Sequence, residues 1–194
     1  MRVLVACEFS GVVRRAFRDR GHEAWSCDLL PAEDLSQYHI KADVLKLLGS
    51  GEWDLIIAHP PCTHLCVSGA RWFEHKRVEQ RQAIYFFTEM ITADAPMVCV
   101  ENPVGIMSTI YRKPDQIIQP WQFGHPESKK TCLWLKNLPK LKPTNILQIP
   151  ESGRWDNQTA SGQNKLGPSE DRWKLRSITY QGIADAMAEQ WGVY

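Results

Sequence analysis

The sequence predicts an α/β fold in which a mostly parallel sheet carries helices on both faces. Apolar runs of strand length alternate with segments of helical periodicity along a chain of 194 residues, and no internal repeat interrupts the alternation. Such alternation is typical of βαβ units, whose crossovers place successive strands parallel. The length suffices for one well-buried domain, so residues 1–194 are expected to form a single domain.

The N-terminal part predicts a strand, a helix and a second strand. The β-branched apolar run of residues 2–7 is typical of a strand, and Val13, Ala16 and Phe17 share one face of a helix predicted over residues 12–20. The second strand is predicted over residues 23–27. Asp28 therefore comes at the end of this second strand.

Two further strands are predicted over residues 53–58 and 97–100, on either side of a helix over residues 74–91. After Asn102 prolines become frequent, and residues 131–135 predict a shorter strand. The polar segment 151–172 predicts a long loop, and residues 180–191 predict a closing helix.

Composition indicates a folded, soluble protein that stays in the cytoplasm. The chain is 43% hydrophobic and 23% charged, and its six cysteines are scattered, which favours reduced thiols. No run approaches the roughly 18 apolar residues that a membrane span needs, and no signal sequence is apparent, so no membrane association is expected. The net charge of +1 decides little, because the basic residues that could bind nucleic acid are clustered. Any one cluster taken alone is more typical of a solvated surface.

The loop after the first strand contains Glu8, Phe9, Ser10 and Gly11, and Asp28 follows about twenty residues beyond that strand. In nucleotide-binding α/β folds an acid at this place binds ribose hydroxyls. The loop lacks the pattern G-x-G-x-x-G, so a ligand with a ribose and no pyrophosphate fits better. A plain strand-turn-helix is an equally good interpretation of this segment.

Two chemically reactive side chains follow neighbouring strands. The segment from His59 to Cys62 comes directly after one predicted strand, and Glu101 and Asn102 come after the next. Because the carboxyl ends of parallel strands meet at one edge, a thiol and a carboxylate should face a common pocket as nucleophile and acid. The alternative is a buried structural thiol, which the two prolines before Cys62 make less attractive.

A metal site is the other interpretation of this segment, because Cys62, His64 and Cys66 alternate. Structural zinc sites more often use pairs of the type C-x2-C in two sets, and no second pair exists in the sequence. The prediction is therefore that no metal is bound.

In this order the motifs resemble those of the DNA (cytosine-5) methyltransferases, in particular the very short phage- and prophage-type members. Pro60, Pro61 and Cys62 match the P-P-C nucleophile motif of that family, and Glu101 with Asn102 matches its E-N pair. The resemblance implies a Rossmann-like methyltransferase fold without a large target-recognition domain, and S-adenosylmethionine as cofactor. The donor-binding residues that it implies are Phe9, Ser10, Gly11, Asp28, Leu29, Asp43, Pro60 and Tyr180.

The resemblance also implies the chemistry. The Cys62 thiolate would add to C6 of a cytosine while Glu101 holds N3, so that C5 becomes nucleophilic enough to take the methyl group. In duplex DNA the base would have to be flipped out. The catalytic residues implied are Cys62 and Glu101, and the substrate-binding residues are Pro61, Asn102, Lys130 and Thr131.

The sequence departs from the family pattern in two places. Cys7 stands where the family usually has an aspartate, which leaves open a modified S-adenosylmethionine as donor. The chain after Leu141 is too short for a large recognition domain, which argues against strong sequence specificity. Cytosine in RNA or in a free nucleotide therefore stays an alternative substrate, and a non-catalytic nucleic-acid-binding relative stays an alternative to an enzyme. An amino-methyltransferase of the N-P-P-Y type is disfavoured, because Cys62 occupies the place of its aromatic residue.

Overall fold

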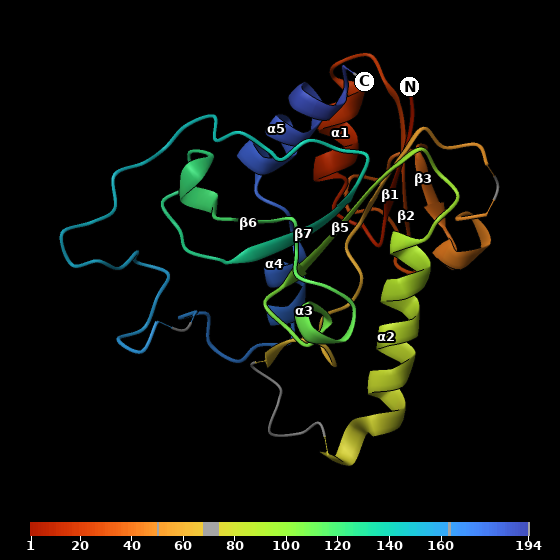
Figure 1. The fold of residues 1–194 in the computed structure, drawn as a ribbon. Coiled ribbons are helices and arrows are strands. Elements are labelled where there is room, and N and C mark those ends of the chain that lie inside the picture. Colours follow the sequence, from red (N-terminus) through yellow and green to blue (C-terminus); the bar gives the residue numbers. More distant parts are fainter. Residues whose placement is uncertain (50, 68–73, 163, 194) are drawn as a thin grey trace.

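In the computed structural model the strands form one mixed sheet of seven, with helices on both faces (Figure 1). The structure describes residues 1–49, 51–67, 74–162 and 164–193. The strand order across the sheet is β3-β2-β1-β4-β5-β7-β6. The strands are β1 (Arg2–Ala6), β2 (Glu23–Asp28), β3 (His39–Lys41), β4 (Leu55–Ala58), β5 (Met97–Pro103), β6 (Gln116–Ile118) and β7 (Thr131–Lys136).

The first five strands of the sheet are parallel, and β7 pairs antiparallel with both β5 and β6. The central strand β4 is buried throughout, as expected for a strand covered on both faces. The predicted mostly parallel sheet is thus confirmed. The short strands β3 and β6 were not predicted, because three residues are too few to show a period.

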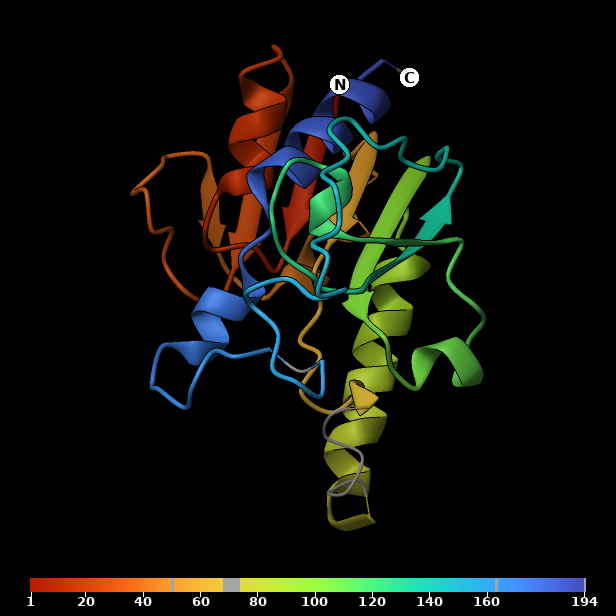
Figure 2. The ribbon, with the colours of Figure 1, turned by 90° about the vertical axis from the view of Figure 1, so that its left-hand side faces the viewer.

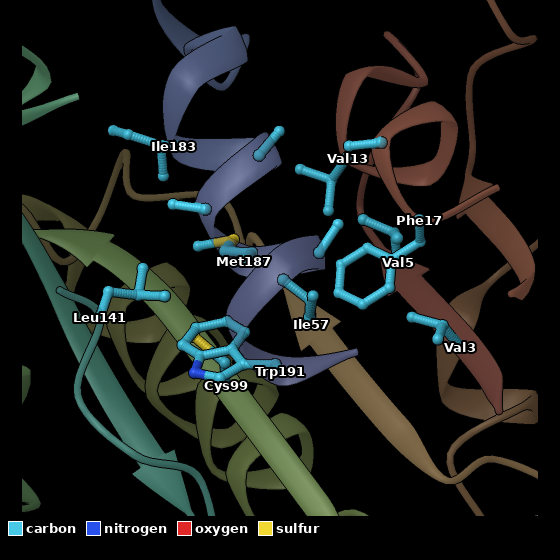
Figure 3. Packing of buried hydrophobic residues seen from close by; sticks show 14 of the residues in the cluster. Val3, Val5, Val13, Phe17, Ile57, Cys99, Leu141, Ile183, Met187 and Trp191 are labelled. Atoms are coloured by element: carbon cyan, nitrogen blue, oxygen red, sulfur yellow. The ribbon is translucent and has the colours of Figure 1, made fainter. Parts of the chain in front are cut away.

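One face of the sheet is covered by α1 (Val12–Arg18) and α5 (Gln181–Trp191), which pack against each other (Figure 1). Phe17, Met187 and Trp191 fill the space between these helices and the strands (Figure 3). The indole of Trp191 also donates a hydrogen bond to the carbonyl of Pro139 at 3.0 Å. The predicted closing helix therefore completes the core on this face, called here the α1/α5 face.

The opposite face, called here the α2 face, is covered by α2 (Arg77–Ile91). Phe87 of α2 packs edge-on against Trp134 of β7, with ring centroids 5.0 Å apart. The N-terminal half of α2 projects beyond the sheet (Figure 2). Helices on both faces were predicted, and this arrangement confirms them.

Several boundaries differ from the prediction. β5 continues to Pro103, because its last residues pair with β7, so Glu101 and Asn102 lie within the strand instead of after it. The short helices α3 (Met107–Ile110) and α4 (Arg172–Ser177) were not predicted. The described part of residues 151–171 contains no helix or strand element, and α4 begins at Arg172, the last residue of the predicted loop. No helix of the described ranges is long and apolar enough to cross a bilayer.

Candidate active site

The register of β4 and β5 brings His59 and Glu101 together. Ala58 pairs with Val100, so the next residue of each chain segment, His59 and Glu101, stand side by side. Alternation along the strands places both side chains on the α1/α5 face, because Ile57 and Cys99 belong to the core of that face. Their side chains join through His59 Nδ1 and Glu101 Oε2, which are 3.0 Å apart.

Glu101 is an ionised carboxylate at neutral pH. Burial acts to raise its pKa, but the hydrogen bond from His59 and the positive charge of Lys129 outweigh burial, and the pKa lies below the ordinary value. One oxygen, Oε2, is used by His59. The described residues give Glu101 no other side-chain hydrogen bond, so Oε1 remains available for a ligand.

Cys62 begins a helical turn at the end of the proline segment. Its carbonyl oxygen accepts hydrogen bonds from the amides of Leu65 and Cys66, at 3.0 and 2.9 Å. The Asn102 side chain donates from Nδ2 to the carbonyl of Pro60 at 2.7 Å, and Asn102 is only 2% exposed. Asn102 lies next to Glu101 in β5, so its side chain is on the α2 face and holds the Cys62 segment from that side. Its predicted contact with a substrate stays a prediction.

The Cys62 side chain is half-buried, and its thiol is neutral at neutral pH. Burial raises its pKa most, followed by Cys66 and the negative charge of Glu101, whereas Arg176 and Lys129 act in the opposite direction. The negative charge of Glu101 is among the causes that raise the Cys62 pKa, so the two groups lie within electrostatic range of each other. The Cys62 thiol therefore carries a proton, which it must lose to become a nucleophilic thiolate.

The loop after β1 is held by a buried carboxylate and a left-handed glycine. Glu8 accepts hydrogen bonds from the amides of Val13 and Arg14, at 2.7 and 3.2 Å, and so satisfies the N-terminus of α1. Gly11 has φ +71°, and a Cβ on it would collide with the Arg14 guanidinium. This position therefore requires glycine. The predicted donor residue Ser10 is buried in the same loop, and its carbonyl accepts a hydrogen bond from Arg15 at 3.0 Å.

Phe9 connects this loop to the end of the chain. Its ring is 5% exposed and lies 5.9 Å from the ring of Trp173 in α4, measured between centroids. Trp173 itself is half-exposed, at 53%. An aromatic pair of this kind can receive a flat ligand at its exposed side.

Asp28 and Asp43 are both predicted to bind the donor. The negative charge of each contributes to the raised pKa of the Cys7 thiol. Cys7 is held at φ 59°, and burial raises the pKa of its thiol, with Asp28, Cys27 and Asp43 adding to the rise. Asp28 also accepts a hydrogen bond from the amide of Leu30 through Oδ1, at 2.9 Å, and Leu29 is 70% exposed beside it. Asp28 is the last residue of β2 and Asp43 follows β3, so both acids lie at the carboxyl ends of strands on the same side of β1 as each other.

Tyr180 contacts the segment that precedes β7. The Tyr180 hydroxyl donates to Glu127 at 2.5 Å, and the ammonium of Lys129 lies 5.7 Å from the Tyr180 ring centroid. Lys129 also donates to the carbonyl of Arg176 at 2.8 Å. Of the predicted substrate residues here, Lys130 is exposed and Thr131 is buried.

Sequence reasoning missed His59, Lys129, Glu8, Trp173 and the action of Arg176 on Cys62. The pairing of β7 with β5 explains the place of Lys129. Leu133 pairs with Glu101 and belongs to the α1/α5 core, so residues two apart from it, Thr131 and Lys129, follow the same side. The basic residue of this segment that acts on Glu101 is therefore Lys129.

No metal cluster is present in the described ranges, where no three His, Cys, Asp or Glu side chains gather closely enough to hold an ion. None of the six cysteines forms a disulfide. The reactive groups that the described residues place at this edge include the Cys62 thiol, the Glu101 carboxylate and the His59 imidazole.

Known proteins resemble this chain in structure and not in sequence. No protein-family model and no curated protein matches it. A candidate DNA modification methyltransferase encoded within a prophage of Escherichia coli is similar at a TM-score of 0.50 and 16% identity, over 77% of this chain and 52% of that one. A Spodoptera frugiperda DNMT2 mutant (TM-score 0.47, 14% identity) covers 79% of this chain and 56% of its own. An rRNA methylase from E. coli (TM-score 0.42, 15% identity) covers 70% and 56%.

The present chain spans about half the length of these solved structures. The likeness to the prophage protein concerns the fold, since its sequence identity is low. The predicted α/β fold class is confirmed, and this chain shares its fold with about half of the prophage protein.

Proposed function

We propose that this protein transfers a methyl group from S-adenosylmethionine to C5 of a cytosine in DNA, through a covalent bond between Cys62 and the base. The observation that carries the proposal is that Cys62 follows β4 and Glu101 lies in the neighbouring strand β5, with the charge of Glu101 acting on the Cys62 thiol. A soft nucleophile beside a carboxylate with one free oxygen suits addition to a pyrimidine ring.

The residues at the ends of β1 and β2 fit the proposed donor. The aromatic pair of Phe9 and Trp173 offers a surface for an adenine ring, and Asp28 and Asp43 offer carboxylates for ribose hydroxyls and amino groups. The loop lacks the glycines that would approach a pyrophosphate, which favours a nucleoside donor without phosphate. When bound, S-adenosylmethionine supplies an electrophilic methyl group.

The proposed mechanism requires a proton to move from Cys62 to Glu101 before the base is attacked. In the free protein Cys62 is a thiol and Glu101 a carboxylate, as their pKa shifts indicate. The reactive form has the thiolate and the carboxylic acid, which contain the same single proton in total. The Cys62 sulfur then bonds to C6 of the base, and the proton of Glu101 passes to N3, so that C5 becomes an enamine carbon.

Completion of the reaction restores the pair. C5 takes the methyl group as the bond between that group and the donor sulfur breaks, then loses its proton to solvent, and the bond between Cys62 and C6 breaks as the aromatic ring reforms. N3 returns its proton to Glu101 in this step. Lys129 and Arg176, whose charges favour the Cys62 thiolate, also supply the positive potential that a phosphate backbone requires.

Covalent trapping tests this proposal directly. A fluorine at C5 cannot leave as a proton does, so a duplex containing 5-fluorocytosine should remain bonded to Cys62 after methyl transfer. Intact-mass spectrometry should show protein plus DNA plus one methyl group, and peptide mapping should place the bond on Cys62.

The same experiment with 5-fluorocytosine in single-stranded RNA and in a free nucleotide separates the alternative substrates. Cys62→Ser is the control, and should form no adduct while it still binds S-adenosylmethionine with unchanged affinity in calorimetry. An adduct with RNA alone would show that the substrate is RNA and not DNA. The absence of an adduct with all three substrates would reject the mechanism.

A further inference from the structure

The imidazole of His59 lies against the carboxylate that the proposed reaction uses, yet it needs no contact with the base itself. We propose that His59 is a positioning residue, whose Nδ1–H group holds Glu101 in the orientation that presents Oε1 to the base. This inference rests on the proposed function of Cys62 and Glu101 and adds a residue to it.

The first support is that a single hydrogen bond orients the Glu101 carboxylate. Nδ1 of His59 and Oε2 of Glu101 are 3.0 Å apart, and the described residues supply no second side-chain bond to Glu101. A carboxylate at the end of a flexible side chain adopts several orientations unless a partner selects one. Loss of the imidazole would thus release Glu101 to rotate.

The second support is that His59 is itself rigidly placed. Its amide donates to the carbonyl of Ala6 at 2.9 Å, which extends the pairing of β4 and β1 by one residue, and Pro60 follows it. The side chain is 8% exposed, compared with 15% for Glu101. The ring therefore has little freedom to move when a substrate enters.

The third support is that only one ring nitrogen has a partner. Nε2 is buried and has no hydrogen-bond partner among the described residues. The Glu101 contact through Nδ1 is thus the only side-chain hydrogen bond that the described part of the chain gives to His59. A side chain that keeps a donor at the Nδ1 position would preserve the proposed role.

This asymmetry defines the test, which uses the full chain with a cytosine-containing duplex and S-adenosylmethionine. The amide of His59→Asn places an N–H group near the position of Nδ1, whereas that of His59→Gln places it near Nε2. His59→Ala removes both. His64→Asn is the matched control, because it makes the same change in the same segment.

The Asn variant should keep kcat within about tenfold of the wild type, since it retains the hydrogen bond with poorer geometry. The Gln and Ala variants should lose kcat by about 100-fold, because a misplaced catalytic group can cost that much. The KM for S-adenosylmethionine should stay constant in all three, and His64→Asn should behave as the wild type.

The pH profile supplies a readout that a merely structural role would not change. The charged groups around His59 are Glu101, Glu8 and Lys129, with Cys62 beyond Glu101 and Arg14 beside Glu8. Removal of the His59 hydrogen bond lets burial raise the pKa of Glu101. The acid limb of kcat/KM should therefore move to higher pH in His59→Ala and stay in place in His59→Asn.

The outcomes separate this inference from the proposed function. If the wild type forms the 5-fluorocytosine adduct while all three His59 variants match it in kcat, positioning by His59 is refuted and the covalent mechanism stands. Equal losses in the Asn and Ala variants, with unchanged thermal melting, would also refute the role of the Nδ1–H group. A wild type that forms no adduct would refute both proposals together.

Discussion

The loop after β1 holds the buried Glu8 and β5 holds the largely buried Glu101, and the two acids differ in the direction of their pKa shifts. Glu8 accepts hydrogen bonds from two amides of α1, but burial outweighs these bonds and the attraction of His59, so its pKa is raised. Glu101 is also buried, but the His59 hydrogen bond and Lys129 outweigh burial, so its pKa is lowered.

The comparison shows that burial alone does not define a reactive carboxylate. Both oxygens of Glu8 accept hydrogen bonds from the backbone, so its carboxylate serves the structure of the loop. Glu101 has one oxygen committed to a side chain and one left for a ligand. We therefore expect changes at Glu101 to affect turnover and changes at Glu8 to affect stability.

Glu101→Gln should give the largest effect. The amide keeps the shape of the side chain but cannot pass a proton to N3, so kcat should fall by about 1,000-fold, within the range for loss of general acid–base catalysis. Measurement of methyl transfer to duplex DNA checks this expectation. Glu8→Gln, assayed in parallel, should retain kcat within about tenfold, since it affects only positioning of the loop. A larger loss of kcat in Glu8→Gln than in Glu101→Gln would reverse the comparison.

Glu8 should dominate the pH dependence of stability above pH 4.5, the ordinary pKa of a glutamate. A raised pKa in the folded state means that the folded protein binds more protons than the unfolded chain, so its contribution to stability falls as pH rises from 4.5 toward the folded pKa. Glu101, whose pKa is lowered, loses its contribution as pH falls below 4.5.

Urea unfolding across this pH range tests the assignment. Glu8→Gln cannot ionise, so it should remove the decline of the free energy of unfolding above pH 4.5 and keep the loss below it. Its free energy of unfolding at low pH should be lower than that of the wild type by about 1 kcal/mol, since one amide hydrogen bond is weakened. An unchanged slope above pH 4.5 would show that Glu8 is not the group responsible.

Trp173→Ala should have the smallest effect on turnover and should separate donor binding at the β1 end from chemistry at the β5 end. The ring of Trp173 faces Phe9. Its loss should weaken binding of S-adenosylmethionine by about tenfold, the upper range for one aromatic contact, and leave kcat at saturation unchanged. Leu175→Ala is the matched control on the same helix, since Leu175 is also half-exposed. Equal affinity in both variants would remove Trp173 from the donor site.

The meeting of the ends of β4 and β5 was predictable because both strands are continuous apolar runs and parallel topology brings such ends together. The face of the sheet on which each side chain lies was harder to predict. Glu101 and Asn102 were expected to act together on a substrate, but the antiparallel pairing with β7 extends β5 and sends their side chains to opposite faces. That pairing joins residues about thirty positions apart and leaves no local pattern in the sequence.

The same limitation explains why Lys130 was singled out and Lys129 was not. Both are basic, and only the register of β7 against β5 decides which one follows the side of Glu101. His59 was quoted as part of the proline motif without a role. Its role depends on a neighbour 42 positions away that no pattern near it could reveal.

The hydrogen bond from Asn102 to Pro60 gives the sheet two distinct sides at the proposed reaction centre. On the α2 face, the buried amide of Asn102 holds the segment that contains Cys62. The His59 imidazole, the Glu101 carboxylate and the Lys129 ammonium group lie on the α1/α5 face. The residues around Lys129 and Tyr180 can therefore be redesigned for a different base or donor without changing the hydrogen bond from Asn102 to Pro60. Conversely, a substitution in the core beneath α2 can displace the Cys62 sulfur without replacing any residue that a ligand would contact.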